Sequence, residues 1–65
     1  MIALTRLSGH AVVVNAALIR TIESRPDTYV TLTDGERLIV RDSVSEVIRK
    51  TIDYQRRLRV LPDAA

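Results

Sequence analysis

Short apolar runs separated by turn residues fill the first two thirds of the chain. Residues 2–7 and 10–14 flank the dipeptide Ser8-Gly9, an arrangement typical of a tight turn between two strands. The second run holds three consecutive valines, whose branched Cβ atoms favour the pleated backbone of a strand. The pattern therefore predicts that the chain begins with a β-hairpin.

The apolar pattern breaks at Asn15. An asparagine side chain can bond to its own backbone two residues on, so residues 16–17 are expected to form a short turn or a helical kink. Residues 18–24 then predict a third strand. Pro26 ends that strand soon afterwards, because proline has no N–H to donate to a ladder.

Residues 28–33 alternate between apolar and polar side chains, as a strand with one buried face requires. The dipeptide Asp34-Gly35 follows and is the strongest local hairpin signal in the chain. We expect a type I′ turn here, which needs a positive φ at both residues. Residues 36–41 return as the fifth strand. The inward face of this hairpin is predicted to carry Val30, Leu32, Leu38 and Val40.

The last third of the chain predicts a helix. Ser43 and Glu46 have the spacing of a capping box, in which each side chain bonds to the other residue's backbone N–H. Steps of 100° per residue place one stripe along the helix, made of Val44, Val47, Ile48, Thr51, Ile52, Gln55 and Leu58. Pro62 is expected to stop the helix, so that residues 1–61 form one domain and residues 62–65 a tail.

Strands followed by a helix indicate an α+β fold. We expect a small curled antiparallel sheet of about five short strands, followed by one C-terminal amphipathic helix that packs on its own sheet or on a neighbour's. A chain of 65 residues buries only about 60% of its unfolded surface and is marginally stable alone. No cysteine is present to add a disulfide. Self-association into a homo-oligomer is therefore expected.

Composition narrows the class of protein. Hydrophobic residues make up 46% of the chain and charged residues 28%, which is ordinary for a folded domain. The apolar runs are too short to span a membrane, and the N-terminus lacks the basic region and apolar core of a secretory signal. The absence of cysteine fits a reducing compartment. These features together indicate a small, soluble, globular domain.

The sequence offers little material for catalysis or metal binding. His10 is the single histidine and has no cysteine beside it, whereas a metal site needs three or four ligands. Gly9 and Gly35 are the only glycines and both belong to predicted turns, so the chain has no glycine-rich phosphate loop. We expect no enzymatic activity, no metal and no cofactor.

One segment is strongly basic. Residues 49–59 hold five cations against the single acid Asp53, a local net charge of +4, whereas residues 1–42 are neutral. A solvated helix whose cations suit the C-terminal end of the helix dipole would explain this charge. A docking surface for an acidic protein, an anionic lipid or nucleic acid would also explain it. The candidate partner-binding residues are Arg49, Lys50, Arg56 and Arg57.

An ordered set of residues covers positions 2–58, nearly the whole chain. Its members are Ile2, Leu4, Thr5, Arg6, Leu7, Gly9, Asn15, Ala16, Leu18, Ile19, Ile22, Glu23, Pro26, Asp27, Thr28, Thr31, Leu32, Thr33, Asp34, Gly35, Val40, Ser43, Glu46, Val47, Ile48 and Tyr54. The set resembles the small bacterial FlbD/SwrD-type family of flagellar proteins, which is unrelated to the transcriptional regulator also called FlbD. Ala17, Arg20 and Asp42 depart from the family pattern.

The resemblance implies a non-enzymatic, cytoplasmic flagellar accessory protein that supports motor function and swarming, or surface motility, through protein–protein interaction. It implies a protein partner, with flagellar motor or stator components as candidates, and a place at the flagellar base by the inner membrane. It implies no cofactor.

A second likeness leads to a different function. Met1, Ile2, Leu4, Thr5, Arg6 and Gly9 also resemble the start of the CsrA-type RNA-binding regulators. That likeness fades after Gly9, and the chain has only two aromatic residues, Tyr29 and Tyr54, on which bases could stack. We therefore expect the flagellar function, keep a small CsrA-like RNA-binding regulator as the alternative, and regard nucleic acid as an unlikely partner.

Overall fold

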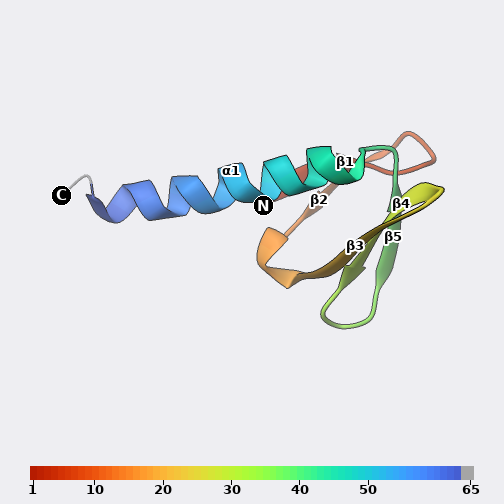
Figure 1. Cartoon of the computed structure of the whole chain (residues 1–65), viewed down its shortest axis with the longest axis horizontal. Coiled ribbons are helices and arrows are strands. Elements are labelled where there is room, and N and C mark those ends of the chain that lie inside the picture. The colour runs from red at the N-terminus through yellow and green to blue at the C-terminus, as the bar shows by residue number, and fades with distance from the viewer. Residues whose placement is uncertain (64–65) are drawn as a thin grey trace.

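The computed structural model describes residues 1–63, with side chains up to residue 58. It has five strands, a short 3-10 helix and one long helix, and it confirms the expected α+β fold (Figure 1). The elements are β1 (Ile2–Thr5), β2 (Ala11–Val14), η1 (Ala16–Leu18), β3 (Ile19–Arg25), β4 (Asp27–Leu32), β5 (Arg37–Val40) and α1 (Val44–Asp63).

The five strands form two antiparallel sheets rather than the single curled sheet that we expected. β1 pairs with β2, and β3, β4 and β5 form the second sheet in that order. A short seam joins the sheets at Arg6, which bridges Val40. The Leu7 N–H donates to the Ile39 carbonyl over 3.0 Å. The two strands separate directly beyond these residues. The seam stays short because one strand enters a turn there and the other leads into α1.

The β1–β2 and β4–β5 hairpins close with the same kind of turn. The Gly9 N–H donates to the Arg6 carbonyl and the Arg6 N–H donates to the His10 carbonyl, each over 2.8 Å. In the second hairpin the Gly35 N–H donates to the Leu32 carbonyl over 2.9 Å, and the Leu32 N–H donates back to Glu36 over 2.8 Å. This pattern is a three-residue loop that ends in a glycine bulge.

The expected type I′ turn at Asp34-Gly35 is therefore wrong. Gly35 has a φ of 90°, but within residues 1–63 no residue other than glycine has a positive φ, so Asp34 does not take the conformation that a type I′ turn needs. Thr33 belongs to the loop, which makes it one residue longer. The Asp34 carboxylate instead accepts a hydrogen bond from the Glu36 N–H over 2.8 Å, which stabilises the loop conformation.

The break at Asn15 forms as predicted. Its side-chain oxygen accepts a hydrogen bond from the Ala17 N–H over 3.1 Å and caps η1. Ala16 is buried, and the chain then enters β3, whose pairing shifts register between Ile19 and Thr21. The short helix thus turns the chain from the first sheet into the second.

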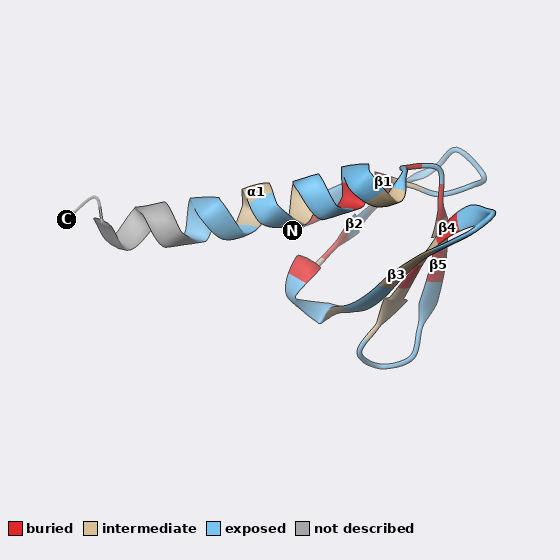
Figure 2. Cartoon of the chain, viewed as in Figure 1, coloured by how far each residue is buried: buried red, intermediate tan, exposed pale blue. Residues whose placement is uncertain are grey.

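The core lies between the inner faces of the two sheets and the first turns of α1 (Figure 2). The predicted inward positions of β4 and β5 are confirmed for Val30, Leu38 and Val40, which are buried, while Leu32 is partly buried and packs against the core. The buried hydrophobic residues are Ile2, Leu4, Val14, Ala16, Val30, Leu38, Val40 and Val47.

The capping box that opens α1 is confirmed. The Ser43 hydroxyl accepts from the Glu46 N–H, and the Glu46 carboxylate accepts from the Ser43 N–H, each over 3.1 Å. The Ser43 N–H and hydroxyl hold the pKa of Glu46 below its ordinary value of 4.5. The helix continues to Asp63, past its expected end at Pro62. Pro62 lies one residue before the end of the helix. The N–H that proline lacks removes only one helical hydrogen bond there.

We predict that Gly35→Val destabilises the protein by about 1 kcal/mol or more, because a β-branched residue is strained at positive φ. This corresponds to a fall in melting temperature of about 4–8 °C for a domain of this size. An added Cβ would meet nothing within 4 Å, so the loss is conformational rather than steric. Thermal unfolding followed by circular dichroism measures it.

Gly35→Asn is the matched control, because asparagine enters the positive-φ region more readily than valine. It should cost clearly less than Gly35→Val. Equal melting temperatures for the two variants would contradict the assignment of the strain to φ.

Candidate protein-interaction surface

The four expected partner-binding side chains do not form one patch. Lys50 turns inward: its ammonium donates to the Ala3 carbonyl over 2.8 Å and to the Asp42 carboxylate over 2.9 Å. Asp42 also accepts from the Thr5 N–H over 2.7 Å. Lys50 therefore ties α1 to β1. Lys50 therefore serves the fold itself, and changing it is expected to reduce stability.

Asp42 is buried at the centre of this contact. Burial by itself would raise the pKa of its carboxyl. The hydrogen bonds from the Thr5 N–H, the Lys50 ammonium and its own backbone N–H, with the positive charge of Lys50, outweigh burial and lower the pKa below its ordinary value of 3.8. The carboxylate therefore stays ionised at neutral pH and keeps its hydrogen bonds with Thr5 and Lys50.

The three arginines lie on different flanks of α1. Arg57 lines a hollow of about 260 Å³ between the helix and β1, where Met1, Lys50 and Tyr54 are its neighbours. Arg56 lines a hollow of about 330 Å³ on the side of the helix turned away from β1. Arg49 borders both hollows and pairs with Asp53 over 3.4 Å. Among the described residues, neither Arg56 nor Arg57 forms a salt bridge.

The predicted apolar stripe of α1 divides into a covered part and an uncovered part. Val47 is fully buried and Tyr54 packs against the core. Ile48, Ile52 and Leu58 are left 44%, 42% and 50% exposed. The sheets are too small to cover the whole stripe. Tyr54 was missed as a core residue, although its spacing of seven from Val47 places it on the same helix face.

Ile48 and Ile52 belong to a mixed apolar and basic surface, which we call the outer face of α1. It consists of Ser45, Ile48, Arg49, Ile52, Asp53 and Arg56. Two exposed isoleucines lie beside two arginines, whose guanidinium groups can each offer paired donors to a carboxylate. This arrangement suits a protein partner that presents acidic and apolar side chains together.

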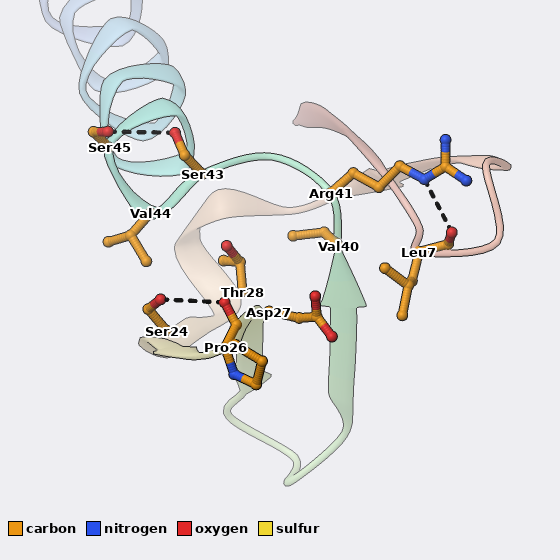
Figure 3. Close-up of a pocket in the computed structure, with 10 residues that line it drawn as sticks. All are labelled: Leu7, Ser24, Pro26, Asp27, Thr28, Val40, Arg41, Ser43, Val44 and Ser45. Atoms are coloured by element: carbon orange, nitrogen blue, oxygen red, sulfur yellow. Dashed lines mark hydrogen bonds between the residues drawn. The ribbon is translucent and has the colours of Figure 1, made fainter.

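A third hollow, of about 450 Å³, lies between the β3–β4 turn, the end of β5 and the start of α1 (Figure 3). Its hydroxyl groups serve local structure: Ser24 donates to the Pro26 carbonyl over 3.5 Å, and Ser43 contacts Ser45 over 3.3 Å. The Nε of Arg41 donates to the Leu7 carbonyl over 3.0 Å and holds the first hairpin loop. None of these contacts joins a hydroxyl to a basic group that could activate it.

His10 lies exposed in the first hairpin loop, where its Nδ1 is 3.1 Å from the Ser8 hydroxyl. Within the described part of the chain, no three of the histidine and carboxylate side chains gather closely enough to hold a metal ion. No helix in that part is long and apolar enough to cross a bilayer.

Comparison with known protein families matches residues 1–59 to the model of the FlbD family, described as flagellar and swarming motility proteins. The chain belongs to this family. The resemblance inferred from the sequence is thereby confirmed. The FlbD family is a motility family and not a family of enzymes. No curated protein sequence and no solved structure matches the chain.

We predict that Lys50→Met lowers the free energy of unfolding by about 1–2 kcal/mol. It keeps the aliphatic stem but leaves the Ala3 carbonyl and one Asp42 oxygen without a partner. Urea unfolding measures the change. Arg56→Met is the matched control, since it removes an exposed cation from the same helix, and should stay within about 0.5 kcal/mol of the parent. Equal losses in the two variants would contradict a structural role for Lys50.

The lowered pKa of Asp42 predicts an acid-sensitive contribution to stability. A carboxyl whose pKa is lower in the folded state stabilises the fold above its unfolded pKa and loses that contribution as the pH falls through the folded value. The stability difference between the parent and Asp42→Asn should therefore be largest near neutral pH and shrink below about pH 4. Urea unfolding between about pH 7 and pH 3 tests this, and a constant difference would contradict it.

Proposed function

We propose that this FlbD-family protein is a non-enzymatic accessory of the flagellar motor that works through a protein–protein contact on the outer face of α1. Its involvement in flagellar and swarming motility follows from the family. The observation that supports the contact is the pair Ile48 and Ile52, left exposed beside Arg49 and Arg56 on a helix whose opposite face is buried.

The chemistry of this surface favours a protein partner with acidic side chains. Exposed isoleucines contribute binding energy by leaving water, about 25 cal/mol per Å² of apolar area. The arginines beside them steer an acidic partner and fix its orientation. Arg57 adds a further positive charge on the neighbouring flank. The candidate partners are cytoplasmic parts of the motor or stator, and the protein would act in the cytoplasm at the flagellar base.

The hollow at the start of α1 supports a role without catalysis. Asp27 and Arg41 are its only charged side chains, and its serines are engaged in turn and cap contacts. An enzyme would need a nucleophile and a base within hydrogen-bond distance of each other in such a place. The arrangement of these side chains instead serves the turn and the helix cap.

Reversing the charge of Arg56 and Arg57 tests the proposal. The double variant Arg56→Glu/Arg57→Glu should keep its melting temperature within a few degrees, since both side chains are exposed. Association with the motor partner should slow roughly tenfold or more and lose its dependence on salt. Swarming on soft agar should fall while the protein level stays normal.

The matched control is Arg20→Glu/Arg37→Glu, which makes the same change of charge at two exposed positions on the strands. Full motility of the Arg56/Arg57 variant at normal abundance would overturn the proposal. Loss of motility only in the strand variant would place the contact near Arg20 and Tyr29.

A photo-crosslinking residue at position 52, compared with one at position 20, identifies the partner directly. The proposal expects a flagellar motor or stator subunit at position 52 and none at position 20. RNA crosslinked at position 52, and retained through a high-salt wash, would instead support the RNA-binding alternative.

A further inference from the structure

The outer edge of β2 carries backbone groups that pair with nothing in the described residues. Because Arg6 bonds to His10, and opposite residues of an antiparallel ladder alternate between bonded and non-bonded pairs, the pairs that include Ala11 and Val13 are non-bonded. Both residues therefore turn their N–H and C=O groups away from β1. β2 pairs with no other strand within residues 1–63.

The outer edge of β1, on the opposite side of this hairpin, is almost fully satisfied. The Ala3 carbonyl accepts from Lys50, and the Thr5 N–H donates to Asp42. The Thr5 carbonyl accepts from the Arg41 N–H over 2.7 Å. The chain therefore closes one edge of the hairpin with its own residues and leaves the other edge open.

The edges of the second sheet are protected in ways that β2 is not. β3 carries Arg20, Glu23 and Arg25 and has a register shift at its start, and both charge and irregularity discourage strand pairing. β5 begins at Arg37 and runs into the seam with the first hairpin. β2 reads Ala-Val-Val-Val, with no charge and no proline, and the Val13 side chain is 65% exposed.

We propose that β2 pairs antiparallel with β2 of a second copy of this chain across a two-fold axis. The axis passes between the two Val12 residues, so that Ala11 of each copy lies opposite Val13 of the other. Two bonded pairs of this kind form four backbone hydrogen bonds. The two hairpins then make one four-stranded sheet, which provides the homo-oligomer that the sequence predicts.

The occupant is a second copy because the strand is complementary to itself. Pairing about this axis sets Ala11 against Val13 of the other copy and Val12 against Val12, so only small apolar side chains meet. β2 brings no charge to such a pair, whereas β3 carries Arg20, Glu23 and Arg25 and β5 carries Arg37. Each exposed Val13 would lie between Ala3 of its own chain and Ala11 of the other, and these small side chains leave room for it.

The pairing uses no residue of α1, so it is independent of the proposed function. Sedimentation equilibrium of the parent is expected to give twice the monomer mass of 7.3 kDa, in a concentration-dependent equilibrium. A chemically synthesised chain can carry a methyl group on the backbone nitrogen of Val13. This change removes one hydrogen-bond donor from the edge of β2 and leaves every side chain in place. Its dimer dissociation constant should rise at least tenfold.

The matched control carries the N-methyl group on Ile22, which the ladder of β3 with β4 places on the outward edge of β3. Its dissociation constant should equal that of the parent. A parent that stays monomeric up to millimolar concentration would overturn the proposal, and so would a dimer that N-methylation of Val13 leaves intact. A dimer broken by Ile52→Glu alone would place the contact on α1 and overturn it too.

Amide hydrogen exchange provides a further test. It uses the unmodified chain, so no substitution or modification can perturb the fold. Exchange at Ala11 and Val13 should slow as the protein concentration rises, because those N–H groups become bonded only in the dimer. Exchange at Ile22 should not change with concentration. Equal exchange at Ala11 and Val13 across the whole range would overturn the proposal.

Discussion

The buried carboxylate of Asp42 is the group on which the arrangement of the two sheets and the helix depends. One oxygen takes the N–H of Thr5 on β1, and the other takes the ammonium of Lys50 on α1, which also reaches the Ala3 carbonyl. An ionised group in a low-dielectric site is tolerated only when its hydrogen bonds are made. The contact therefore favours one relative position of β1 and α1 and penalises others.

The small size of the hydrophobic core explains why so much of the surface is left available for contact with other proteins. A chain of this size buries few side chains fully, and the sheets reach only the first turns of a helix that continues well beyond them (Figure 2). The molecule measures 43 × 22 × 18 Å along its principal axes, so the helix makes it elongated rather than spherical. The outer face of α1 and the open edge of β2 both arise from this shortage of covering surface.

Local signals in the sequence predicted the elements but not how the elements meet. The capping pair Ser43 and Glu46 and the alternation along β4 depend on near neighbours, so they could be identified from the sequence. The dipeptide Asp34-Gly35 fits a loop of two or of three residues, and strand register decides between them. The local positive charge pointed to α1 as the candidate surface. Which of its cations face inward depends on how the helix is rotated about its own axis against the sheets, and this rotation turns Lys50 inward and Arg56 outward.

The joining of the first strand to the last helix also shapes the route by which the chain folds. Each glycine loop closes over three residues, whereas the contacts of Asp42 with Thr5 and of Lys50 with Ala3 span 37 and 47 positions. Loop-closure entropy rises with length, and distant contacts slow folding. We therefore expect the hairpins to assemble early and reversibly, and attachment of the N-terminal strand to the helix to be the late step that commits the chain to its native topology.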